Sequence, residues 1–373
     1  MKNYQAVLLE KAKTIMENPN SERNYFAWPS IIATKDGKLI AGASGYRKRH
    51  VCPYGTVVVT DSEDGGKTWG PLRTIINTCL DDRDCGLTTF GESGVIATSF
   101  NNTVENQRMR AMKMQYGIDE AEQASTLAHL DTITPEEEAK VLGSVFAVSF
   151  DNGKTFGELY KSPITNPHGP IEMKNGDLLW CGARMHPEYP YTEEEGIECY
   201  VVNPYTGEMT FRGKIAPLVE GEEKWQSHEP HMIELPSGKL ICHIRAEGKR
   251  EDYNEFSMFQ SVSYDSGKTW SVPERLLGKR GGAPAHLMLH SSGVLICMYT
   301  WREAPYEIRA IVSEDEGVTW SEPITVCDTN SITRDIGYPM SVELEDGEIL
   351  TVFYAHDAKN APAVIKQIRW RLV

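Results

Sequence analysis

The sequence predicts an all-β protein, a six-bladed β-propeller, and this prediction rests on two repeats and their period. A phrase of the form Ser-x-Asp-x-Gly-x-Thr-Trp, with Phe in place of Trp in one copy, occurs four times, and a glycine that precedes an apolar run occurs six times. Repeats of about 50 residues with several short apolar runs are typical of four-stranded propeller blades, which cannot bury their faces alone. We therefore expect the 373 residues to form one domain, a closed ring of six blades.

The first repeat has the chemistry of a tight turn. Its four copies begin at Ser62, Ser149, Ser263 and Ser313. In each copy the Asp carboxylate can accept hydrogen bonds from the backbone amides ahead of it, the Gly supplies a positive φ, and the aromatic residue returns to the core. We expect each copy to fasten a hairpin and to take no part in chemistry.

The second repeat defines the blades. Its glycines are Gly37, Gly94, Gly176, Gly238, Gly293 and Gly347, which by subtraction lie 57, 82, 62, 55 and 54 residues apart. The long interval contains residues 102–142, a polar stretch with helical spacing and a helix start at Thr134-Pro135, and it predicts a helical insert. Residues 1–20 predict an amphipathic N-terminal helix, and residues 363–370 predict a strand that finishes the last blade and helps to close the ring.

The charge and composition of the chain argue against some classes of function. The net charge of −15 argues against a nucleic-acid surface, because phosphate binding needs a basic field. No apolar run of about 18 residues is present, and charges interrupt the N-terminal apolar run, so we expect no membrane span, no signal peptide and a cytoplasmic location. Three of the eight cysteines, Cys181, Cys242 and Cys297, fall in apolar runs, which predicts buried thiols in a reducing compartment.

The repeated Asp phrase resembles the Asp box, or BNR repeat, of the sialidase superfamily, and the resemblance extends from about Tyr25 to Trp370. Sialidases use Tyr as nucleophile, a Glu that takes its proton, an Asp as acid/base and three arginines that hold the substrate carboxylate. By resemblance, the stretch that begins Gly337-Tyr338-Pro339 supplies Tyr338 as nucleophile. The stretch that begins His228-Glu229-Pro230 supplies Glu229 as its partner and Arg245 as one arginine.

Two parts of the sialidase pattern are missing. Ala27 stands where the first arginine is expected, and residues 41–59 contain no carboxylate to serve as the acid/base. For the acid we consider Asp84 or Asp82, whose pKa burial in a funnel can raise, and His50. Asp84 is expected at the blade position of His168 and His228.

Other polar side chains cluster at the expected blade mouths. We expect substrate binding from Arg47, Arg83, Arg245, Arg302, His168, His228, His286 and Trp301. A third clamping arginine is either Arg302 or Arg309, and Trp301 packs either against a sugar or against a neighbouring blade. For the histidines three roles stay open: substrate or proton transfer, structure, or a metal site. The metal site is the least favoured of the three, and we expect no metal and no cofactor.

The leading hypothesis is therefore a sialidase-like glycoside hydrolase that acts on sialic-acid-like or other acidic glycans. A second hypothesis is a uronate-directed lyase or another non-hydrolytic sugar enzyme, in which His50 or Tyr338 removes a proton. A third is a non-catalytic glycan-binding propeller, because a shared fold does not guarantee shared chemistry. The expected partner is an anionic carbohydrate for the two enzyme hypotheses, and a glycan or a protein for the non-catalytic propeller.

Overall fold

The computed structural model describes residues 2–185, 195–249, 254–277, 282, 284–358 and 361–373, and its strands form six antiparallel sheets. Blade 1 contains β2 (Tyr25–Ala33), β3 (Leu39–Arg47), β4 (Thr56–Ser62) and β5 (Arg73–Ile76). Blade 2 contains β6 (Arg83–Phe90), β7 (Gly94–Phe100), β8 (Ser144–Ser149) and β9 (Tyr160–Ser162). Blade 3 contains β10 (Ile164–Thr165), β11 (Ile171–Glu172), β12 (Leu178–Arg184), β13 (Ile197–Val202) and β14 (Met209–Ile215).

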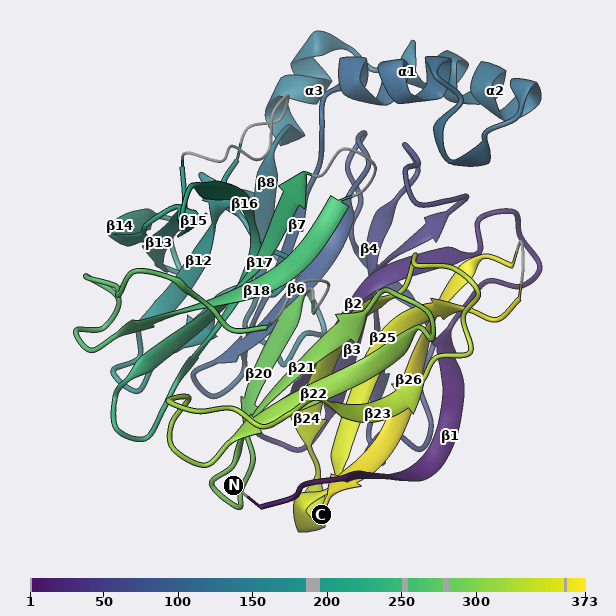
Figure 1. Ribbon diagram of the computed structural model, residues 1–373. Helices are drawn as coiled ribbons and strands as arrows, with labels where there is room; N and C mark the ends of the chain where they lie inside the picture. Colours follow the sequence, from purple (N-terminus) through teal and green to yellow (C-terminus); the bar gives the residue numbers. More distant parts are fainter. Residues whose placement is uncertain (1, 186–194, 250–253, 278–281, 283, 359–360) are drawn as a thin grey trace.

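The remaining sheets come from the second half of the chain. Blade 4 contains β15 (Leu218–Glu220), β16 (Glu223–Glu234), β17 (Leu240–Lys249), β18 (Asn254–Ser263) and β19 (Glu274–Arg275). Blade 5 contains β20 (Ala285–Leu289), β21 (Leu295–Trp301), β22 (Glu307–Ser313) and β23 (Ile324–Asp328). Blade 6 contains β24 (Gly337–Glu343), β25 (Ile349–His356), β26 (Ala363–Leu372) and β1 (Ala6–Met16). Inner strands of neighbouring blades contact one another around the full circle, so the ring is closed and the predicted six-bladed propeller is confirmed (Figure 1).

The core lies between the blades. Each of six buried apolar clusters combines side chains from two neighbouring blades. Because side chains alternate along a strand, Leu39 and Ala41 of β3 pack toward blade 6 while Ile40 packs toward blade 2. The three cysteines expected to be buried, Cys181, Cys242 and Cys297, are all in these clusters.

The Asp phrases form the turns between the last two strands of blades 1, 2, 4 and 5. In the copy after β22, Asp315 accepts hydrogen bonds from the Thr319 amide (2.8 Å) and the Thr319 hydroxyl (2.5 Å), and the Ser313 hydroxyl accepts one from the Gly317 amide (2.8 Å). The same pattern recurs in the other three copies. These turns are scaffold, as the sequence predicts.

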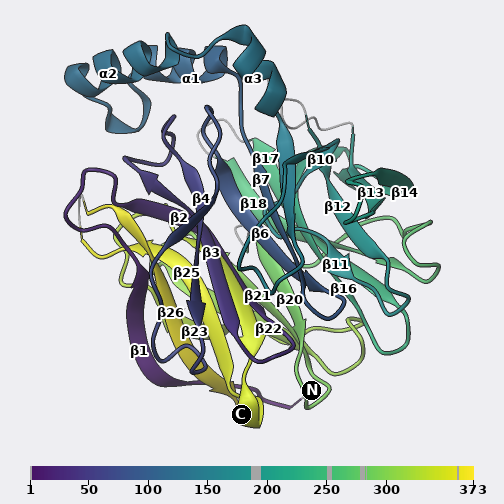
Figure 2. The same ribbon diagram turned by 180° about the vertical axis from the view of Figure 1, so that it is seen from behind.

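The N-terminal segment corrects one prediction. The expected helix over residues 1–20 is wrong, because Ala6–Met16 is strand β1, which pairs antiparallel with β26 and completes blade 6 (Figures 1 and 2). Helix propensity favours residues such as Leu, Glu and Lys, but the open edge of β26 offers backbone partners, and tertiary pairing overrides propensity. The C-terminal strand β26, which was expected to finish the last blade, is therefore its third strand. The N-terminal strand β1 is the outermost strand and completes the blade.

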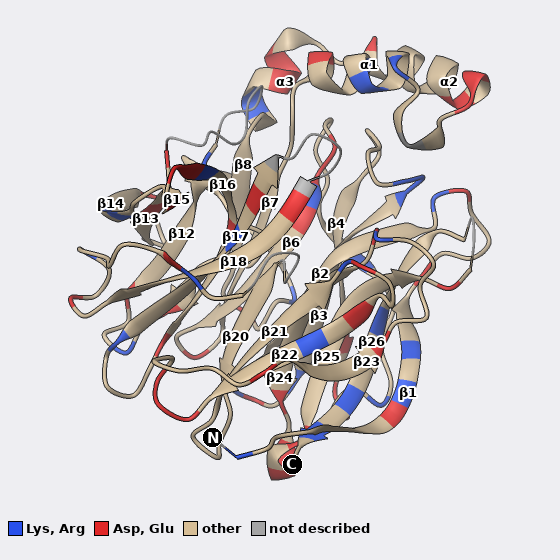
Figure 3. Ribbon diagram, viewed as in Figure 1, with Lys and Arg blue, Asp and Glu red and all other residues tan. Residues whose placement is uncertain are grey.

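The insert between β7 and β8 contains helices α1 (Val104–Met112), α2 (Glu120–Leu130) and α3 (Pro135–Val141), with a short 3₁₀ turn at Gln115–Gly117. Another 3₁₀ turn, Glu345–Gly347, lies between β24 and β25. Thr134 caps α3 with a reciprocal Thr–Glu capping box and Pro135 follows it. The insert lies at the end of the ring opposite the two chain termini (Figure 1). None of the described helices is long and apolar enough to cross a membrane. Charged residues of both signs are spread over loops, helices and strands (Figure 3).

Candidate active site

A cavity of about 510 Å³ lies beside the helical insert, which supplies part of its lining. Its walls come from blades 1, 2, 4, 5 and 6 and from the insert. The lining residues are Trp28, His50, Val51, Arg83, Asp84, Phe100, Asn102, Arg110, Gln226, His228, Glu229, Arg245, Glu247, Arg302 and Tyr338.

Four of these residues occupy equivalent positions in the inner strands of four blades. Trp28, Asp84, Glu229 and Tyr338 have left-handed backbones, with φ of 55°, 57°, 40° and 53°. Each lies in a β-bulge, where the pairing with the next strand skips residues. A bulge re-aims a side chain, and such strain in non-glycine residues gathers at functional sites. Here the bulges turn all four side chains into the cavity.

The positions of the bulges also correct the predicted blade position of Asp84. Asp84 was expected at the blade position of His168 and His228, but it matches Glu229 and Tyr338, because Arg83 pairs like His228 at the start of its bulge. Pro follows Trp28, Glu229 and Tyr338, and a residue without an N–H fits a bulge well. Asp84 is followed by Cys85 and not by Pro, so the sequence did not reveal that Asp84 is equivalent to Glu229 and Tyr338.

Tyr338, Glu229 and Arg245 form one buried hydrogen-bonded group. The Tyr338 hydroxyl donates to Glu229 Oε1 at 2.5 Å, and Arg245 Nη1 donates to Glu229 Oε2 at 2.5 Å and to the Tyr338 oxygen at 3.2 Å. Burial opposes ionisation of Glu229, but the Arg245 guanidinium and the Tyr338 hydroxyl lower its pKa to about 2. Burial, and then the Glu229 charge, raise the pKa of Tyr338 well above its usual value. At neutral pH, the pair is therefore a phenol that donates to a carboxylate able to take its proton.

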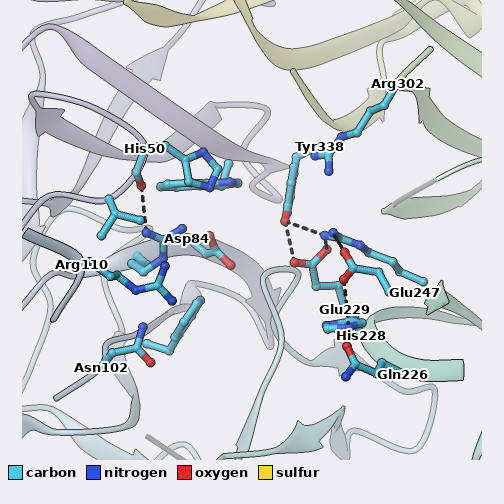
Figure 4. Close-up of a pocket in the computed structure, with 15 residues that line it drawn as sticks. His50, Asp84, Asn102, Arg110, Gln226, His228, Glu229, Glu247, Arg302 and Tyr338 are labelled. Carbon is cyan, nitrogen blue, oxygen red and sulfur yellow. Dashed lines mark hydrogen bonds and ion pairs between the residues drawn. The ribbon is translucent and has the colours of Figure 1, made fainter. Parts of the chain in front are cut away.

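Asp84 lies across the cavity from Tyr338, as the close-up view shows (Figure 4). Burial raises the pKa of Asp84 to about 7; the Arg83 guanidinium opposes this shift and the Glu229 carboxylate reinforces it. A carboxyl group with a pKa near neutrality can donate a proton to one reacting group and take it back from another. Burial also raises the pKa of Asp82 to about 7, but Asp82 is outside the cavity lining and accepts hydrogen bonds from the Thr78 amide and hydroxyl.

His50 also lines the cavity, and Asp335 holds it in place. His50 Nδ1 is 3.0 Å from Asp335 Oδ1, and the hydroxyls of Tyr25 and Tyr354 donate to the same carboxylate at 2.8 and 3.0 Å. Because an ionised carboxylate only accepts, Nδ1 carries the proton. Burial lowers the pKa of His50, so its ring is neutral at pH 7. No sequence pattern pointed to Asp335, which lies 285 positions from His50.

The expected arginines divide into two groups. Arg83, Arg245 and Arg302 line the cavity. Arg302 donates to the Ile336 carbonyl at 3.1 Å and lies over the Tyr338 ring at 5.7 Å. Arg47 is a correction: it is fully buried outside the lining, where Asp81 accepts two hydrogen bonds from it at 2.5 and 3.0 Å. That ion pair satisfies the guanidinium and leaves it none of the exposure that substrate binding needs.

His168, His286 and Trp301 are also placed away from the cavity. His168 and His286 are buried on either side of His231, with ring centroids 4.9 and 4.6 Å from it, and burial lowers the pKa of each to about 4 and about 3. With His231 they form a group of buried, neutral imidazoles in edge-on and tilted contact. Trp301 packs under the Arg309 guanidinium at 4.2 Å. Of the expected histidines, His50 and His228 line the cavity.

Within the described ranges, no group of three or more His, Cys, Asp or Glu side chains is arranged to hold a metal ion. Lining residues that sequence reasoning missed include Asn102, Arg110, Gln226 and Glu247. Asn102 and Arg110 belong to the insert, whose packing against the ring has no local sequence signal. Glu247 lies two residues after Arg245 in β17 and pairs with it, so the spacing of the two was a usable signal.

Comparison with known proteins agrees with this architecture. A solved structure of a protein of unknown function from Dyadobacter fermentans superposes with a TM-score of 0.74 at 20% identity, over 99% of both chains. The NanB sialidase from Streptococcus pneumoniae superposes with a TM-score of 0.66 at 12% identity, over 97% of this chain and 70% of that one. The α-L-arabinanase from Penicillium chrysogenum gives 0.59 at 13% identity, over 97% and 98%.

These likenesses establish a fold that sialidases and arabinan-degrading enzymes share. The family itself is assigned by a family model, that of the BNR repeat-like domain, which matches residues 132–351, more than half of the chain. The chain belongs to the BNR repeat-like domain family.

Proposed function

We propose that this protein is a retaining glycoside hydrolase that cleaves an acidic sugar, sialic-acid-like in the charge it presents, from a glycan. The observation that carries the proposal is the 2.5 Å hydrogen bond from Tyr338 to Glu229, in the wall of a cavity whose facing wall presents Asp84. A nucleophile beside its base, opposite a carboxyl with a pKa of about 7, has the parts that double displacement requires.

The reaction has two steps. In the first, the Tyr338 oxygen attacks the anomeric carbon while its proton passes to Glu229. The bond from that carbon to the leaving oxygen breaks, and Asp84 gives its proton to this oxygen. In the second, the Asp84 carboxylate takes a proton from water, the water oxygen bonds to the anomeric carbon, and the Tyr338 oxygen leaves and recovers its proton from Glu229.

Charge favours an acidic substrate. Four arginines line the cavity, against two glutamates and Asp84, which is protonated below pH 7. Arg245 is paired with both glutamates, but no described carboxylate pairs with Arg302. Guanidinium groups bind carboxylates through planar, paired hydrogen bonds, so Arg302, with Arg245 behind Tyr338, suits the carboxylate of the sugar that is cleaved.

The test is a panel of 4-methylumbelliferyl glycosides, sialosides and uronide oligosaccharides, with the anomer of the first product followed by NMR. The proposal predicts release of an acidic sugar with retained configuration. An inverted first product, or no product from any member of the panel, would refute it.

A second candidate rests on a separate observation, the neutral His50 held by Asp335. A uronate-directed elimination needs a base that removes the proton next to the carboxylate and an arginine that neutralises this carboxylate. His50 and Arg302 would fill these roles. Elimination leaves a carbon–carbon double bond, so ultraviolet absorbance of the product separates it from hydrolysis.

A further inference from the structure

We propose that the helical insert supplies a second anion-binding position, Arg110, and that the preferred substrate therefore carries a second acidic sugar directly on its leaving-group side. This inference rests on the proposed hydrolysis and specifies its substrate: a glycan in which two acidic residues are adjacent.

Arg110 is a cation in the cavity without an anionic partner in the described part of the chain. It belongs to α1, is half-buried and lines the same cavity as Tyr338. Its Nε donates to Asn106 Oδ1 at 2.8 Å and its Nη1 approaches Gln115 Oε1 at 3.5 Å, and both of these acceptors are neutral. The two contacts orient the guanidinium and leave its charge uncompensated. Such a group lowers the free energy of a bound anion.

The insert is fastened to blades 1 and 2, so Arg110 is held in place before substrate binds. The Gln107 side chain, one turn before Arg110, donates to the buried Asp81 carboxylate at 3.2 Å. Arg49 of blade 1 forms an ion pair with Glu122 of α2, and the Tyr54 hydroxyl donates to the Ser125 carbonyl at 3.4 Å. Preorganisation of this kind reduces the ordering cost that binding otherwise carries.

The position of Arg110 indicates which part of the substrate it meets. In the close-up view, Arg110 and Asn102 lie with Asp84 and His50 on one side of the cavity, and Tyr338, Glu229 and Arg302 lie on the other (Figure 4). In a retaining enzyme the acid stands beside the leaving oxygen and the nucleophile stands on the opposite face of the sugar ring. Arg110 is therefore next to the leaving group, while Arg302 serves the sugar that is cleaved. Two separated cationic positions match two successive carboxylates.

The experiment compares two substrates that share the cleaved sugar. One is 4-methylumbelliferyl α-sialoside, whose leaving group is neutral, and the other is a disialoside in which a second sialic acid is the leaving group. The measured quantity is the ratio of kcat/KM for the disialoside to kcat/KM for the aryl sialoside. Arg110→Gln should lower this ratio by about 10- to 100-fold, the range expected when a charge-assisted hydrogen bond is lost. Arg110→Lys, which keeps the charge, should retain part of the preference.

Arg108→Gln is the matched control, because Arg108 is in the same helix but pairs with Asp131 at 2.7 Å and is outside the cavity lining. It should keep the wild-type ratio. If Arg110→Gln also keeps that ratio while the wild-type protein cleaves the aryl sialoside, the inference about Arg110 is wrong and the proposed hydrolysis stands. If the wild-type protein cleaves neither substrate, sialoside hydrolysis fails and the inference fails with it.

Discussion

The Tyr338 hydroxyl donates a 2.5 Å hydrogen bond to Glu229, although 109 positions separate the two residues in the chain. The two side chains meet because each follows the first residue of an equivalent bulge in an inner strand, one in blade 4 and one in blade 6. The propeller thus converts a sequence repeat into a shared site.

Tyr338→Phe removes the attacking oxygen and keeps the ring that packs near Tyr354. Loss of a catalytic nucleophile typically lowers kcat by about 10³-fold or more, and we expect that loss here. Steady-state kinetics on the substrate found by the glycoside panel measures it, with circular dichroism as the check on folding. Activity within a few-fold of wild type would rule out Tyr338 as nucleophile.

The dependence of kcat/KM on pH should have an alkaline limb near pH 7. Asp84 must be protonated to act as the acid, so activity is present below its pKa of about 7 and decreases as pH rises through that value. Glu229, with a pKa of about 2, stays ionised throughout this range. Asp84→Asn should abolish the limb and lower kcat by about 10²- to 10⁴-fold, with the larger losses on poor leaving groups. An unchanged limb in this variant would assign the titration to another group, with His50 the first to test.

Asp84 should also reduce stability at high pH. Its pKa is about 7 in the folded protein and near 3.8 in an unfolded chain, so the unfolded state binds fewer protons between these values and the free energy of unfolding decreases as pH rises. Asp84→Asn removes this penalty and should raise the free energy of unfolding by about 1 to 4 kcal/mol at pH 8, with no gain at pH 4. Urea unfolding at the two pH values tests the sign. A gain of equal size at both would contradict it.

Asp315→Ala should affect stability alone. The substitution removes the hydrogen bonds from Thr319 and Ser313 to the Asp315 carboxylate, in a turn none of whose residues lines the cavity. Because the turn is largely exposed, we expect a loss of about 1 to 3 kcal/mol in unfolding free energy. The value of kcat/KM should match that of wild type. A selective loss of activity in a fully folded variant would show that this turn is more than scaffold.

The features of the fold and of the site that the sequence predicted are those that short stretches of the chain determine. The Asp turns and the glycine turns specify hairpins by their own backbone chemistry, and their spacing gave the number of blades. Tyr338 and Glu229 were identified because their stretches resemble the sialidase pattern, and each precedes a Pro at the same distance from its blade glycine. Arg245 was identified from the same resemblance, and in the structure it lies on the strand that pairs with the strand of Glu229.

The parts that sequence missed depend on contacts between distant segments. The strand β1 forms because β26, more than 340 positions away, offers an open edge. Asp335 meets His50, and Arg110 reaches the cavity, only after the blades and the insert have packed together. Arg47 has the right spacing for substrate binding but is neutralised by Asp81, which no periodic pattern reveals.

The most direct test of the central claim is mass spectrometry of the protein after incubation with a fluorinated glycosyl fluoride of the cleaved sugar, an analogue that slows release of the covalent intermediate. The account predicts that the mass of one fluorosugar is added to the proteolytic peptide that contains Tyr338, and that Tyr338→Phe prevents the addition. Attachment to Glu229, to Asp84 or to no residue of an enzyme that hydrolyses the parent glycoside would contradict it.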